Sequence, residues 1–231
     1  MVYRYISDAF VSEGKRKFVG REIASNLGMS PNTVNLAVKQ LSKIGCAMLY
    51  KRHFEISNFD KLLIYWAVNR KFEKDIVYRT YVEAKGHDEI ERHMPEGIVL
   101  TNYSAYVKLF GNDASDYSEV YVYANDSAFK AIKERFPPQQ FSQRSDYHNL
   151  IVLKPDYVME KEIMERLNVT AAPSPISAPY AMPSPLLRKG TVSLAQLYVD
   201  LWNAKEWYSN EFLKRLKMII SAQDKLWTIP R

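Results

Sequence analysis

The sequence of 231 residues contains a single cysteine, Cys46, and lacks long apolar runs. One cysteine excludes an internal disulfide and a zinc site built from several cysteines, and its apolar surroundings indicate an inert core residue in a strand. No run of 18 apolar residues occurs, and the first residues lack the charged-then-apolar pattern of a signal peptide. We therefore expect a cytoplasmic protein.

The sequence also lacks the short motifs of common enzymes. It has no glycine-rich phosphate loop and no Gly-x-Ser-x-Gly element. His87, Asp88 and His93 do not match a familiar metal-ligand spacing, and Asp113 and Asp116 lie in an apparent turn with no Gly-Ser element before them. We expect no catalytic residues, no metal and no cofactor, so the protein is predicted not to be an enzyme.

Acidic residues are absent from the whole segment between Met29 and Phe54. Residues 1–82 contain 14 Lys or Arg and 7 Asp or Glu, a net charge of +7, whereas the complete chain has a net charge of +6. The basic excess is therefore confined to the first third of the sequence. This distribution favours a module that binds a polyanion, joined to a nearly neutral partner domain.

The order of predicted elements in residues 1–57 is typical of a winged helix-turn-helix. A helix over residues 2–11 precedes a basic loop, and a short helix over 21–28 ends at a glycine suited to a left-handed cap. Ser30 and Pro31 then start a helix over 31–44 whose apolar positions recur at helical spacing. Two strands, 46–50 and 53–57, form a hairpin with a basic tip.

In this motif the third helix enters the major groove of double-stranded DNA and the wing lies along the backbone. Asparagine can pair with adenine, threonine can contact a phosphate or a thymine methyl group, and lysine can reach guanine or phosphate. Roughly five neutralised phosphates would give a log–log salt slope near −4 to −5. The predicted DNA-binding residues are Lys15, Arg16, Lys17, Arg21, Asn32, Thr33, Asn35, Lys39, Lys43, Lys51 and Arg52.

The remaining sequence predicts a connecting helix within residues 58–75 and a mixed α/β domain over 76–231 that senses or binds a partner. Strands are expected at 76–82, 97–101, 119–123 and 149–153, with helices at 89–94, 104–110 and 127–136 between them. Residues 170–185 are rich in proline and favour an extended crossing. Helical spacing returns over 193–220. The overall fold class is α+β.

Tyrosines recur along the predicted strands and helices of the second domain: Tyr78, Tyr81, Tyr103, Tyr106, Tyr121 and Tyr123. Such residues can stack on single-stranded bases, but alternating tyrosines on strands are more often half-buried sheet residues. We therefore predict that they belong to the core.

Four segments resemble the AbiEi family of antitoxin-type transcriptional regulators. They are residues 21–50, 62–67, 100–106 and 193–201, and the first of them carries the specific motif. The resemblance implies an N-terminal winged helix that binds a promoter, often its own, and a C-terminal domain that counters a nucleotidyltransferase toxin. The proline-rich stretch at 170–185 departs from the family pattern.

These observations predict a sequence-specific, double-stranded-DNA-binding transcriptional regulator, with the autoregulating antitoxin as one form of it. An RNA- or protein-binding adaptor that uses the winged helix as a scaffold is the alternative from another class, and a nucleotidyltransferase-like enzyme is a third. Winged-helix regulators often dimerise on paired half-sites. No heptad segment identifies an interface here, so homodimerisation stays open.

Overall fold

The computed structural model describes residues 1–111, 114–138, 147–171 and 190–222. These residues form eleven helices and two small sheets, so the α+β class is confirmed. The chain divides into two compact units. Among the described residues, unit 1 consists of those within Met1–Arg70, Ser193–Asn203 and 213–222, and unit 2 consists of those within Lys71–Val192 and Ala204–Phe212.

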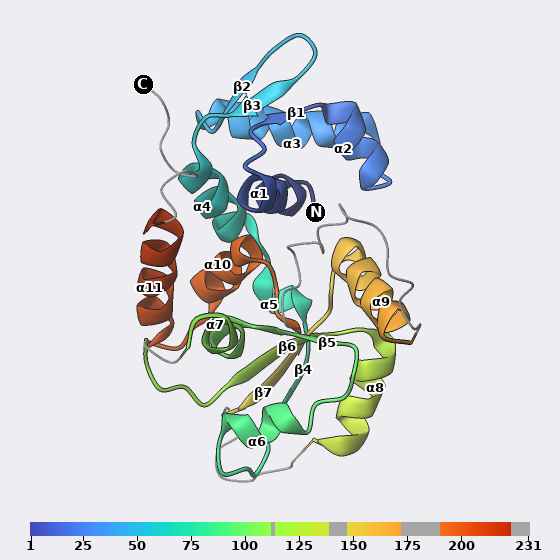
Figure 1. Ribbon diagram of the computed structural model, residues 1–231, viewed down its shortest axis with the longest axis vertical. Helices are drawn as coiled ribbons and strands as arrows, with labels where there is room; N and C mark the ends of the chain where they lie inside the picture. The colour runs from blue at the N-terminus through green and yellow to red at the C-terminus, as the bar shows by residue number, and fades with distance from the viewer. Residues whose placement is uncertain (112–113, 139–146, 172–189, 223–231) are drawn as a thin grey trace. The chain divides into compact units, whose positions relative to one another are not determined.

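Unit 1 begins with three helices and a small antiparallel sheet (Figure 1). The helices are α1 (Val2–Glu13), α2 (Gly20–Asn26) and α3 (Pro31–Lys43). The strands are β1 (Lys17–Phe18), β2 (Ala47–Leu49) and β3 (Phe54–Ile56), in the order β1-β3-β2. The basic run at 15–17 was predicted to be a loop, but Lys17 pairs with Glu55 in the sheet because the chain runs alongside β3.

The turn between α2 and α3 has the predicted chemistry. Gly28 adopts a φ of 61°, the left-handed conformation that favours glycine. Ser30 precedes α3, and its Oγ accepts a hydrogen bond from the Thr33 backbone N–H at 3.1 Å. Pro31 is the first residue of the helix, where its missing N–H leaves no bond unmade. This turn fixes where α3 starts.

Helix α3 is amphipathic, and one face of it is buried. Val34, Val38 and Leu41 are at most 4% exposed. Their spacing of four and three residues places them on one side of the helix, and each contributes about 1.5–3 kcal/mol through burial. The helix packs on α2, which leaves its opposite face to solvent.

Unit 1 is completed by α4 (Phe59–Asn69), α10 (Leu194–Asn203) and most of α11 (Ser209–Ala222). Asn58 caps α4, because its Oδ1 accepts from the Lys61 N–H at 2.9 Å. The helix ends at Asn69, within the predicted range of 58–75, and α5 (Phe72–Asp75) follows it as the first helix of unit 2. Helix α10 packs against both α1 and α4.

The division into units therefore differs from the predicted boundaries at 57 and 75. Residues 193–203 were grouped with the second domain, but buried polar contacts tie them to unit 1. Ser193 donates a hydrogen bond to Asp8, and Arg70 forms an ion pair with Asp200. Gln196 Nε2 also donates to Asp200, at 2.8 Å. The physical reason for the difference is pairing between segments 130 or more residues apart in sequence.

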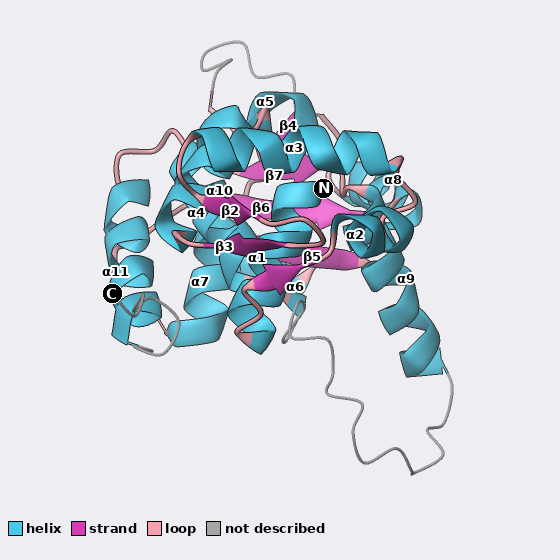
Figure 2. Ribbon diagram, turned by 90° about the horizontal axis from the view of Figure 1, so that it is seen from above, coloured by secondary structure: helices cyan, strands magenta, loops and turns pink. Residues whose placement is uncertain are grey.

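Unit 2 is built on a four-stranded sheet in the order β4-β7-β6-β5 (Figure 2). The strands are β4 (Ile76–Thr80), β5 (Ile98–Thr101), β6 (Val120–Ala124) and β7 (Leu150–Leu153). Strands β6 and β7 are parallel, and the two outer pairs are antiparallel. Every residue of the two central strands is buried, as expected for a sheet covered on both faces.

The helices of unit 2 surround this sheet. Besides α5 and the first turn of α11, they are α6 (His87–Arg92), α7 (Asn102–Phe110), α8 (Asp126–Arg135) and α9 (Tyr157–Ala171). All four predicted strands and three predicted helices are present with small boundary shifts, whereas α9 was not predicted. The proline-rich stretch at 170–185 lies almost entirely outside the described residues.

The prediction that the tyrosines of unit 2 belong to the core is confirmed for the most part. Tyr103, Tyr106, Tyr121 and Tyr123 are buried, and Tyr78 and Tyr81 are half-buried.

Two carboxylates lie among these tyrosines. Glu206 accepts hydrogen bonds from the hydroxyls of Tyr103 and Tyr121, both at 2.7 Å, and Glu119 accepts from Tyr208. Burial, and then the neighbouring Glu206 carboxylate, raise the pKa of Glu119 above its usual range. Glu119 therefore binds its proton more tightly in the folded chain than in the unfolded chain.

We expect the Asp200→Ala variant to lose roughly 3–5 kcal/mol of unfolding free energy, because it leaves the nearly buried Arg70 without its carboxylate. Urea denaturation followed by circular dichroism measures this loss. The matched control is Glu13→Ala, which removes an exposed carboxylate from α1 and should change stability by at most about 0.5 kcal/mol. Equal stabilities of the two variants would contradict the role given to the ion pair.

Replacing Glu119 by glutamine should change how stability depends on pH. A raised folded-state pKa contributes stability that is present below the unfolded pKa, about 4.3, and is lost as the pH rises through the folded value. The glutamine side chain would keep an acceptor for Tyr208 and cannot ionise. The unfolding free energy of the Glu119→Gln variant, measured relative to that of the parent, should therefore increase as the pH rises from 4 to 8. An exposed Glu96→Gln control should show no such trend.

Candidate nucleic-acid interface

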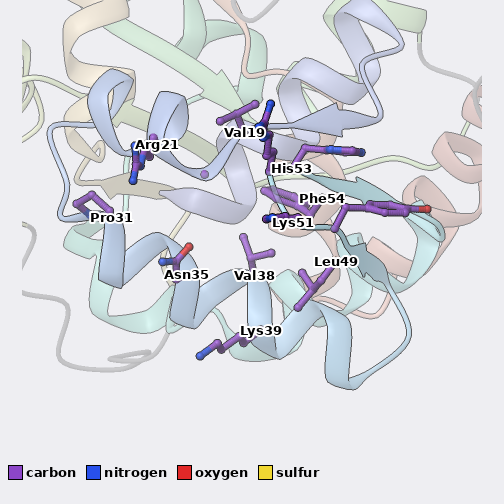
Figure 3. A pocket seen from close by; sticks show the side chains of 13 residues that line it. Val19, Arg21, Pro31, Asn35, Val38, Lys39, Leu49, Lys51, His53 and Phe54 are labelled. Atoms are coloured by element: carbon purple, nitrogen blue, oxygen red, sulfur yellow. The ribbon is translucent and has the colours of Figure 1, made fainter.

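A groove of about 670 Å³ lies between α2, α3 and the β2–β3 hairpin of unit 1. Figure 3 shows side chains from these three segments around it. The α2 side contributes Val19, Gly20 and Arg21, and α3 contributes Pro31, Asn35, Val38 and Lys39. The hairpin contributes Leu49, Tyr50, Lys51, Arg52, His53 and Phe54.

The lining of the groove is basic and contains no acidic side chain among the described residues. Its charged groups are Arg21, Lys39, Lys51 and Arg52, all of them exposed. They come from three separate segments of the chain, and only the fold brings them together. Such a concentration of positive charge in a concave surface raises the local concentration of anions and attracts a polyanion.

The hairpin turn is held in shape by two aromatic side chains. The rings of Tyr50 and His53 stack with centroids 4.6 Å apart and an angle of 14° between their planes. The Tyr50 N–H donates to the His53 carbonyl at 2.9 Å, which closes the turn. His53 Nε2 also lies 3.2 Å from a Glu55 carboxylate oxygen. Lys51 and Arg52 are thereby presented at the tip.

The structure brings five of the eleven predicted residues into this groove: Arg21, Asn35, Lys39, Lys51 and Arg52. Asn32, Thr33 and Lys43 are exposed on α3 but do not line it. The hydroxyl oxygen of Thr33 lies 2.8 Å from Ser30 Oγ, so it takes part in the cap that starts the helix.

The basic run at 15–17 does not line the groove either. The Lys15 ammonium lies over the ring of Phe18 at 5.5 Å, and the Arg16 guanidinium lies over that of Phe10 at 5.6 Å. These cation–π contacts leave both residues half-buried, while Lys17 is exposed on β1. The run therefore adds positive charge to unit 1 away from the groove lining.

Sequence reasoning gave no role to Gly20, Leu49, Tyr50 or His53, all of which line the groove. An ideal Cβ at Gly20 would lie 3.4 Å from Asn35 Oδ1, which shows how closely the α2 backbone approaches α3. The predicted hairpin is the signal that could have found the others, because Tyr50 and His53 flank its turn and Leu49 precedes Tyr50.

The other clusters considered from the sequence have local partners. His87 stacks on Tyr117 with ring centroids 3.9 Å apart, and His93 Nδ1 lies 2.7 Å from the Glu89 carbonyl oxygen. Asp113 lies outside the described residues. Within the described part of the chain, no group of three His, Cys, Asp or Glu side chains is arranged to hold a metal. The described helices also include none with the length and apolar character of a membrane span.

Cys46 lies at the joint between α3 and the hairpin. It immediately precedes β2, where a strand residue was predicted, and it is fully buried. Its N–H donates to the Leu41 carbonyl at 2.8 Å, and its carbonyl accepts from the N–H of Ser57 at 2.9 Å. Burial raises the pKa of the Cys46 thiol to about 12, against a smaller lowering by Lys61. This joint fixes the hairpin relative to α3.

Comparisons of the chain with protein-family models, with curated proteins and with solved structures find no match.

We expect Cys46 to resist alkylation in the native chain, because it is buried and remains a thiol at pH 8. It is the only cysteine, so the stoichiometry of modification by iodoacetamide, measured by mass spectrometry, reports on this joint alone. The chain in urea is the control and should react fully. Rapid modification without denaturant would show that the joint opens readily.

Proposed function

We propose that residues 1–57 form a winged helix-turn-helix that binds double-stranded DNA, and that the protein is a transcriptional regulator. The observation that carries the proposal is the acid-free groove lined by Arg21, Lys39, Lys51 and Arg52. Helix α3 is the recognition helix in this proposal, and the β2–β3 hairpin is the wing.

The groove suits a sugar-phosphate strand that passes between the two DNA-contacting elements. With α3 in the major groove and the wing over the adjacent backbone, one strand would run between Lys39 on the helix and Lys51 and Arg52 on the wing. Lysine and arginine contacts to phosphate position the protein without selecting a sequence. Asn35, on the same side of α3, would add a contact that selects adenine.

The resemblance to AbiEi-type regulators extends the proposal to the regulated site. It implies that the DNA upstream of the protein's own gene is the operator, and that unit 2 binds a partner, a nucleotidyltransferase toxin in that family. The proposal for unit 1 does not depend on this extension, because it is supported by charge and geometry alone.

A double variant, Lys51→Ala with Arg52→Ala, should weaken binding to every duplex and make the salt dependence less steep. Each lost phosphate contact lowers the magnitude of the log–log slope by about 0.9, so the slope should fall by about 1.8. Fluorescence anisotropy with the upstream duplex and with a random duplex, over a series of salt concentrations, gives both slopes. Lys130→Ala with Lys154→Ala removes the same charge from exposed positions of unit 2 and serves as the control.

The Asn35→Ala variant should behave differently from the wing variant. It should relax discrimination at one base pair by roughly 1–3 kcal/mol and leave affinity for random duplex unchanged. Binding that is equal for duplex and single-stranded RNA, or equal slopes for the wing variant and its unit 2 control, would overturn the proposal.

A further inference from the structure

The outer face of α3 is polar except at its centre. With Val34, Val38 and Leu41 toward the core, the helical step of about 100° places Asn32, Leu36 and Lys43 nearest to the opposite direction. All three are exposed. In the proposed winged helix this face enters the major groove, so the inference that follows rests on that function.

Leu36 is the exception on this face. Its exposed fraction is 54%, the highest of any large hydrophobic residue described within residues 1–57. The groove beside the wing does not include it. An exposed leucine can form no hydrogen bond with a base or a phosphate, and a contact with an apolar group is the interaction that would bury it.

We infer that Leu36 contacts the C5-methyl group of a thymine and selects that base in the operator. The major groove presents one apolar group on its base edges, the thymine methyl, and apolar side chains recognise it. A leucine placed against the donors and acceptors of another base would leave those groups without a hydrogen-bond partner. Other bases are therefore unfavourable opposite Leu36.

The neighbours of Leu36 specify where that thymine lies. Asn32 is one helical turn away on the same face, with Cβ atoms about 6 Å apart, and asparagine pairs bidentately with adenine. Successive base pairs are about 3.4 Å apart along the duplex. The thymine selected by Leu36 should therefore lie within about two base pairs of the adenine contacted by Asn32.

The test starts from a duplex selected from a random pool by the full chain, in which each thymine is replaced in turn by uracil. Uracil lacks only the C5-methyl group. One replacement should weaken binding about fourfold, the effect of exposing one buried methyl-sized group. Leu36→Ala and Leu36→Gln should bind the thymine duplex that much more weakly and should no longer distinguish thymine from uracil.

Two further variants control the experiment. Leu36→Met keeps an apolar side chain and should retain the thymine preference, and Gln40→Ala removes a neighbouring exposed side chain of α3 and should also retain it. All variants should bind random duplex at low salt like the parent, which shows that they are folded.

The outcomes separate this inference from the proposed function. If no duplex is enriched from the pool, sequence-specific binding is absent and both statements fall. If duplexes are enriched but no uracil replacement weakens binding, or if Leu36→Ala keeps the thymine preference, the DNA-binding function stands and the role of Leu36 is overturned.

Discussion

The ion pair between Arg70 and Asp200 joins two segments of unit 1 that are separated in sequence by residues 71–192. The chain leaves unit 1 at Arg70 and returns at Ser193, and both points are held by buried polar contacts. Asp200 is fully buried and also accepts from Gln196 within α10, so the ion pair with Arg70 links α10 to the end of α4. The packing of α1, α4 and α10 depends on this pairing.

This arrangement makes Lys71–Val192, the larger part of unit 2, an insertion between two segments of unit 1, and Ala204–Phe212 is a second, shorter one. Insertions are tolerated where the points of departure and return are held by the host domain. The basic excess predicted from residues 1–82 reflects the same organisation, because most of those residues belong to unit 1. The groove uses residues 19–54 and lies wholly within the first segment.

Local signals in the sequence predicted most of the elements but not their grouping. The Ser30 cap, Pro31 and the spacing of Val34, Val38 and Leu41 act within a few residues, and α3 was predicted almost to its last residue. The assignment of α10 to unit 1 depends on Asp8 and Arg70, far away in sequence, for which no local pattern exists. In the part of helix α9 whose side chains are described, residues 157–164, Met159 and Ile163 are buried, which leaves little apolar periodicity for sequence reasoning to detect.

The candidate site shows the same limit. Exposure of Asn35, Lys39, Lys51 and Arg52 follows from helix and hairpin periodicity, so sequence reasoning could name them. The position of the hairpin against α3 decides which of the eleven predicted residues line the groove. That position is fixed at the buried joint around Cys46, which depends on contacts between separate segments.

The discontinuity of unit 1 has a consequence for its synthesis. Residues 1–70 emerge from the ribosome first, but α10 follows only after about 120 more residues, which takes roughly 6–25 s at about 5–20 residues per second. During that time the apolar side of α4, including Leu62 and Leu63, lacks one of its packing partners. The half of the protein that carries the basic groove is therefore completed late in translation, although its groove is encoded first.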